Sequence, residues 1–142
     1  MIRALAFAAV MYPSLALAGE ITVSDAYVPA APTGAMAHAA YMELTNTGTE
    51  TRSLIGLKSP TYAMVHLHQS VEKDGIATMS AVHQLDIKPG QTVKLEPGGY
   101  HVMLMKPLAP LGVGDTVDLV LEFANGEMLE ATASVVRLNG SS

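Results

Sequence analysis

The chain contains no cysteine among its 142 residues. This absence excludes disulfide scaffolds, thiolate zinc sites, iron–sulfur clusters, cysteine nucleophiles and cysteine-ligated blue-copper centres. Tryptophan is also absent and phenylalanine occurs only twice, whereas methionine occurs 9 times. This imbalance is a first indication that thioether sulfur has a role in this protein.

Charge is scarce as well, because only 15% of the residues are charged while 49% are apolar. Such a composition is typical of a folded chain and excludes a disordered one. Lysine and arginine number 8 against 13 acidic residues, and no basic patch is visible. We therefore expect no nucleic-acid partner. The length favours a single domain.

The first residues have the organisation of a secretory signal peptide. Arg3 gives a positive start, an apolar stretch follows, and Ala16-Leu17-Ala18 forms a small-x-small cleavage site. The apolar stretch is too short for a membrane anchor, and Pro13 interrupts it. We expect residues 1–18 to be removed and residues 19–142 to form one domain without a membrane span. The signal predicts export, to the periplasm if the source is Gram-negative.

The remainder of the chain reads as short segments of alternating polarity, separated by Gly, Pro and Asn clusters. No helical period is sustained. Several short strands with closely spaced turn signals predict an all-β fold of two packed antiparallel sheets, a β-sandwich of the immunoglobulin-like kind. The expected strands cover residues 21–27, 38–46, 52–58, 64–71, 76–81, 92–95, 100–106, 116–123 and 128–137.

Turn residues and alternation refine this prediction. Asn125-Gly126 predicts a hairpin closed by a tight primed turn, which requires positive φ, and Asp74-Gly75 punctuates the middle of the chain. Because side chains alternate between faces along a strand, one face of segment 116–123 is expected to enter the core. That face carries Val117, Leu119, Leu121 and Phe123.

Most of the chemically informative side chains lie between residues 64 and 105. This segment holds four of the 5 histidines and four of the 9 methionines. On each of two predicted strands, these residues alternate with apolar ones and so share a single face. One strand carries Met64, His66 and His68 on this face, and the other carries His101, Met103 and Met105.

Several interpretations of this face are open. Methionine is a common core residue, so the face can be plain packing in a sandwich that serves as an adhesion or interaction module. His66, His68 and His101 could instead form a three-histidine zinc site in an enzyme, although this leaves the methionines unexplained. Thioether is a poor ligand for hard cations and a good one for Cu(I), and imidazole binds copper in either oxidation state. The chemistry therefore favours a soft copper site.

The spacing of four of these residues resembles a known family. His68, Met79, His101 and Met103 match the H-x(10)-M-x(21)-H-x-M signature of the PCuAC family of periplasmic copper chaperones. The segment from Lys88 to Met105 is similar to the most recognisable stretch of that family, and residues 39–46 resemble its early strand. The resemblance covers nearly all of residues 19–142.

The resemblance implies a cupredoxin-like Greek-key sandwich that binds one Cu(I) through His68, Met79, His101 and Met103. His66 and Met105 lie outside the signature, but alternation places them on the same face, so we expect them to be accessory positions. The resemblance also implies a monomeric, non-enzymatic chaperone that delivers copper to the CuA-bearing subunit of cytochrome c oxidase, alongside thiol-bearing copper carriers. A periplasmic copper storage or resistance role would use the same site.

Alternation also predicts the depth of this site. The ligand face lies opposite Val65, Leu67, Val102 and Leu104, which are expected to enter the core. We therefore expect copper to lie at the sandwich surface, with His101 and Met103 exposed on one strand. Since the core would hold these strands in place, the metal-free protein is expected to be folded.

Overall fold

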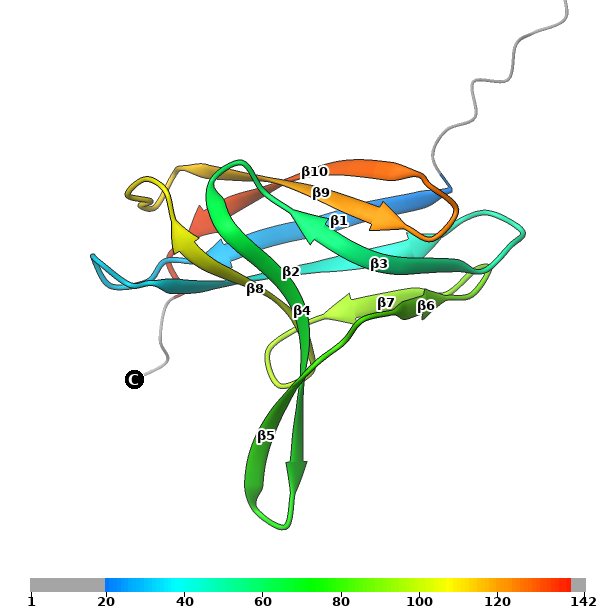
Figure 1. Cartoon of the computed structure of the whole chain (residues 1–142), viewed down its shortest axis with the longest axis horizontal. Coiled ribbons are helices and arrows are strands. Elements are labelled where there is room, and N and C mark those ends of the chain that lie inside the picture. Colours follow the sequence, from blue (N-terminus) through cyan, green and yellow to red (C-terminus); the bar gives the residue numbers. More distant parts are fainter. Residues whose placement is uncertain (1–19, 139–142) are drawn as a thin grey trace, which may run out of the picture.

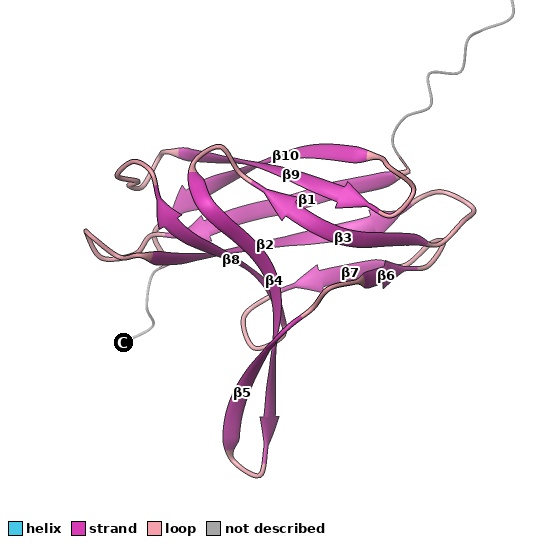
Figure 2. Ribbon diagram, in the orientation of Figure 1, coloured by secondary structure: helices cyan, strands magenta, loops and turns pink. Residues whose placement is uncertain are grey.

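The computed structural model describes residues 20–138, which form ten strands and no helix (Figures 1 and 2). The all-β prediction is therefore confirmed. In this part of the chain, no helix is long and apolar enough to cross a membrane. The expected signal peptide, residues 1–18, lies outside the described residues.

The strands are β1 (Ile21–Pro29), β2 (Ala37–Asn46), β3 (Arg52–Lys58), β4 (Tyr62–Lys73), β5 (Ile76–Ala81), β6 (Leu85–Ile87), β7 (Thr92–Leu95), β8 (Tyr100–Pro107), β9 (Thr116–Phe123) and β10 (Met128–Val136).

Nine of these strands were predicted, and four of them have the predicted bounds: β3, β5, β7 and β9. The prediction missed β6, which is only three residues long. Three residues give too few alternations to be recognised in a sequence. β6 forms because Leu85 and Ile87 are buried and the strand pairs with the edge of β3.

The ten strands form one continuous hydrogen-bonded sheet in the order β5-β4-β8-β7-β2-β1-β10-β9-β3-β6. This differs from the two separate sheets that were expected. β1 is the link, because it pairs antiparallel with β2 and parallel with β10. The sheet bends over on itself, so that its two halves face each other across a common core, as in a sandwich (Figure 1).

The core lies between the two halves and is built from alternate positions of the strands. The predicted inner face of β9 is confirmed, since its four residues are at most 3% exposed. β4 and β8 contribute their predicted apolar residues to the same core. Each buried aliphatic side chain contributes roughly 1.5–3 kcal/mol of transfer free energy, which holds both strands in place. These β4 and β8 residues are Val65, Leu67, Val102 and Leu104.

β4 and β5 form a hairpin that projects away from the body of the sandwich (Figure 1). Its turn is Asp74-Gly75, with φ of 54° and 76°. Two central residues with positive φ define a type I′ turn, the connection that matches the twist of a two-residue hairpin. The turn fixes the register of the whole hairpin, from Lys73 opposite Ile76 to His68 opposite Ala81.

The hairpin predicted at Asn125-Gly126 is also present, between β9 and β10, but its turn differs from the expected one. Only Gly126 has positive φ, at 89°. The loop is closed by hydrogen bonds from Gly126 N to Phe123 O (3.0 Å) and from Phe123 N to Glu127 O (2.9 Å). A three-residue loop with a left-handed glycine at its end explains this geometry without a primed turn.

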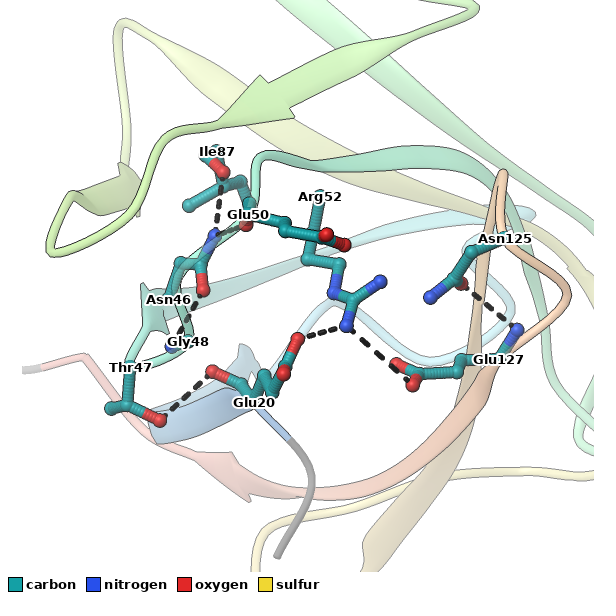
Figure 3. Close-up of polar contacts among 9 residues, drawn as sticks. All are labelled: Glu20, Asn46, Thr47, Gly48, Glu50, Arg52, Ile87, Asn125 and Glu127. Atoms are coloured by element: carbon teal, nitrogen blue, oxygen red, sulfur yellow. Dashed lines mark hydrogen bonds and ion pairs between the residues drawn. The ribbon is translucent and has the colours of Figure 1, made fainter. Parts of the chain in front are cut away.

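A polar cluster ties together the ends of β1, β2, β3 and β6 (Figure 3). Asn46 is completely buried, and its side-chain amide donates to the carbonyls of Glu50 (2.7 Å) and Ile87 (2.8 Å). Its side-chain oxygen accepts from Gly48 N (2.9 Å). Nearby, Arg52 pairs with Glu20. Asn46 thus makes hydrogen bonds to three backbone groups, and these bonds connect the β2–β3 turn to β6.

We expect Asn46→Ala to lower the free energy of unfolding by about 2–3 kcal/mol, because it leaves buried backbone groups without partners. Urea denaturation of the metal-free protein measures this loss. Asn125→Ala is the matched control, since the Asn125 side chain makes one exposed hydrogen bond, to Glu127 N, and its loss should cost less than about 1 kcal/mol. Equal effects of the two substitutions would contradict the structural role of Asn46.

Candidate metal centre

The antiparallel pairing of β4 with β8 brings the predicted ligand faces together. His68 lies directly opposite His101, and His66 lies opposite Met103. Residues directly opposite one another on an antiparallel pair share a face, with Cβ atoms about 4.5–5.5 Å apart. The structure therefore joins segments that are more than thirty residues apart in sequence into one row of imidazoles and thioethers, as the sequence predicted.

Met79 reaches this row from the hairpin. It lies opposite Ser70 on β4, two positions from His68, and Ala81 lies directly opposite His68. Because Ser70 and His68 point to the same face, Met79 also lies on that face, as a diagonal neighbour of His68. Met79 is 57% exposed, so its thioether lies on the open side of the candidate site.

His101 is buried, with 5% of its surface exposed, which corrects the expectation of an exposed ligand strand. β8 is an inner strand, flanked by β4 on one side and by β2 and β7 on the other. His101 Nδ1 lies 3.2 Å from the carbonyl oxygen of Gly99. A carbonyl can only accept, so Nδ1 carries a proton, and Nε2 is the nitrogen that bears the lone pair in the neutral ring. Nε2 is buried and has no hydrogen-bond partner.

The Gly99 carbonyl also accepts a hydrogen bond from Ser70 N on β4 (3.0 Å). One backbone oxygen thus orients the His101 ring and ties it to the base of the hairpin. Such a partner fixes the tautomer and direction of a metal-binding imidazole. No sequence pattern marks Gly99 as such a partner, although the Pro97-Gly98-Gly99 turn immediately precedes β8.

His68 completes the centre of the row. Its ring centroid lies 5.9 Å from that of His101, with the planes at 68°, and its Nδ1 is buried without a partner. Burial lowers the pKa of His68, and repulsion from His101 and His66 lowers it further. His68 is therefore held neutral, which is the form that binds a metal ion. Two facing imidazoles that each keep one buried, unpaired nitrogen are the arrangement expected of a pair of metal ligands.

The remaining predicted residues continue the row beyond this centre. His66 is exposed, and its ring stacks against that of His68 with centroids 6.3 Å apart. Met103 and Met105 are half-buried. The four principal residues thus span a gradient of burial, from His101 inside to Met79 outside, rather than a uniformly shallow surface.

The donor set is uncharged. Across residues 20–138, no three His, Asp or Glu side chains gather into a group that could hold a metal ion. His66, His68 and His101 lie along one face without forming such a group, so the geometry gives no support to a three-histidine zinc centre. The candidate site is therefore a mixed imidazole and thioether site, which suits a soft monovalent ion better than a hard divalent one.

Comparison with known proteins identifies the family of this chain. A family model described as "Putative lipoprotein LpqE-like" matches residues 21–135, and the chain belongs to this LpqE-like family. A relative in Leifsonia xyli subsp. xyli, named "Putative lipoprotein Lxx21020", is 35% identical over 125 residues, covering 87% of this chain and 74% of the relative.

Solved structures connect the family to PCuAC domains. The chain is similar to the solution structure of CuI-DR1885 from Deinococcus radiodurans, with 35% identity, 80% of this chain and 76% of that chain covered, and a TM-score of 0.65. The copper-bound PCuAC domain from PmoF2 has the same fold, at 23% identity, 84% and 95% coverage and a TM-score of 0.70. The resemblance to the PCuAC family and its cupredoxin-like fold is thereby confirmed.

Met103→Ala should leave the metal-free fold nearly intact, because Met103 is half-buried on the outer face of β8. We expect a loss of less than about 1.5 kcal/mol in the free energy of unfolding, whereas Leu104→Ala on the inner face should cost roughly 2–5 kcal/mol. Urea denaturation of both metal-free variants tests this contrast. A loss for Met103→Ala as large as that for Leu104→Ala would make Met103 a core residue and favour the packing interpretation.

Proposed function

We propose that this protein is a periplasmic copper chaperone that binds one Cu(I) through His68, Met79, His101 and Met103. The observation that carries the proposal is the pair of facing imidazoles, His68 and His101, each with a buried nitrogen that lacks a hydrogen-bond partner. Thioethers lie beside this pair on the same face. The Cu(I)-bound state of the similar Deinococcus protein supports the choice of metal.

The donor set explains why Cu(I) rather than Cu(II) is the proposed cargo. Thioether sulfur is a soft ligand that favours the monovalent ion, and neutral imidazole binds both. No cysteine is available in the chain, so imidazole and thioether together are the softest combination that it can offer. Such a site adds no negative charge, so the bound ion keeps its net positive charge.

The charge of the site bears on copper release. An acceptor with two thiolates, such as the CuA-bearing subunit of cytochrome c oxidase or a thiol-bearing carrier, is anionic and softer, and should win Cu(I) by ligand exchange. The exposed Met79 is the donor that an incoming sulfur can displace first, while the buried His101 still holds the ion. The gradient of burial thus supports stepwise hand-over, with delivery as the proposed role.

Export to the periplasm is part of the proposal. Its support is the expected signal peptide at residues 1–18 together with the lipoprotein name of the Leifsonia relative, since lipoproteins are exported. In that oxidising compartment, a chain without cysteine holds copper without the risk of disulfide formation.

The binding site is tested by titrating the metal-free protein with Cu(I) under anaerobic conditions against a coloured chelator. We expect one tightly bound ion, with both nitrogen and sulfur scattering in the X-ray absorption spectrum. Loss of a residue that only hydrogen-bonds to a metal ligand typically lowers metal affinity roughly 10- to 100-fold. His101→Ala removes a ligand itself, so it should lower the affinity for Cu(I) by more than this. His83→Ala, an exposed histidine outside the strands, should not change it. A spectrum with only nitrogen and oxygen donors would contradict the assignment.

Delivery is tested by mixing the Cu(I)-loaded protein with a metal-free, reduced soluble CuA domain and measuring copper in each after separation. We expect copper to move to the CuA domain, and to stay where it is when the acceptor cysteines are replaced by serine. If the protein retains its copper in the presence of the intact acceptor, the role is storage or resistance rather than delivery.

A further inference from the structure

The row of donors on β4 and β8 is longer than the proposed site. One step beyond the His66–Met103 pair, Met64 lies directly opposite Met105 on the same face. The proposed site uses neither of these two methionines. They form a pair made only of thioethers, at the end of the row that lies away from the projecting hairpin.

The spacing of this methionine pair suits a separate ion. Opposite side chains have Cβ atoms about 4.5–5.5 Å apart, and methionine has three rotatable bonds, so the two sulfurs can converge on one ion. Successive pairs on one face are two residues apart, which is roughly 7 Å along the strand. The methionine pair therefore lies about two such steps from the imidazole pair, with His66 and Met103 between them.

The methionine pair is also accessible. Met64 is 40% exposed and Met105 is half-buried, so neither side chain is committed to the core. The outer face of β9 and β10, which is exposed in a similar way, pairs Asp118 with Thr132 and Val120 with Glu130. Three of these four residues carry a charge or a hydroxyl group and none carries a thioether, whereas both members of the methionine pair are thioethers.

We propose that Met64 and Met105 form a second, weaker Cu(I) site, which receives copper and passes it along the row to the site at His68 and His101. This inference rests on the proposed function. Two neutral thioethers offer fewer and weaker donors than two imidazoles with two thioethers, so the ion moves towards the tighter site. Met103 belongs to the tighter site and lies, with His66, next to the methionine pair, so these two residues provide the intermediate donors. The oxidation state of copper does not change.

This arrangement separates loading from release. Copper enters at the methionine pair, while the exposed Met79 at the other end of the row stays accessible to the acceptor. Each step exchanges one donor for its neighbour on the same face, so the ion never leaves the protein during the transfer.

The second site is tested by titrating the metal-free protein with Cu(I) while recording NMR spectra of methionines labelled at the methyl carbon. The first equivalent should shift the signals of Met79 and Met103, and a second, weaker equivalent should shift those of Met64 and Met105. The double variant Met64→Leu and Met105→Leu should lose the second equivalent and keep the first within about twofold. Leucine conserves volume, so this variant should fold normally.

Met128→Leu is the matched control, because Met128 is 68% exposed on β10, away from the row, and should leave both equivalents unchanged. If only one ion binds and the Met64 and Met105 signals never move, the second site is overturned and the proposed function stands. Loss of the first equivalent in the double variant also overturns it, because the two methionines then belong to the first site. If the unaltered protein binds no Cu(I), both proposals fail.

Discussion

The antiparallel pairing of β4 with β8 is the interaction on which the core and the candidate site both depend. One side of the paired strands carries Leu67 and Val102 into the core, and the other carries His68 and His101. Because alternation is strict, the hydrophobic burial that sets the register of the inner face also sets the register of the donors. A slip of one residue would place apolar side chains outside and the imidazoles inside, so the core protects the geometry of the site.

The projecting hairpin has the opposite character. All six residues of β5 are exposed, and the hairpin is held by its own hydrogen bonds and by the type I′ turn at Asp74-Gly75. Met79 is therefore positioned by local turn chemistry rather than by the core. The candidate site combines the buried His101 with the exposed Met79, and the Gly99 carbonyl connects the two parts through its bonds to His101 and Ser70 N. This combination suits a protein that must hold copper and also release it.

Neutral donors give the site its selectivity. Burial lowers the pKa of His68, and repulsion from His101 and His66 lowers it further, which favours the neutral form of this ring. Because the proposed donors include no carboxylate or thiolate, the site offers little stabilisation to a hard divalent cation. In the proposed function, the same neutrality keeps the affinity for Cu(I) low enough for an anionic, sulfur-bearing acceptor to take the ion. In the proposed function, selectivity for Cu(I) and transfer to the acceptor thus have a common origin in the uncharged donor set.

The sequence by itself determined the all-β class, the bounds of four strands and the two faces of β4 and β8, because alternation and turn residues are local signals. It also indicated the donor set, since the spacing of His68, Met79, His101 and Met103 is a property of the chain. The tertiary structure decided the rest. β6 exists because its short apolar segment reaches the edge of β3, and the single sheet results from the double pairing of β1. The strands that flank β8 determine the burial of His101, its unpaired Nε2 and the contact with the Gly99 carbonyl. Strand neighbours are set by long-range packing, which no local sequence pattern records.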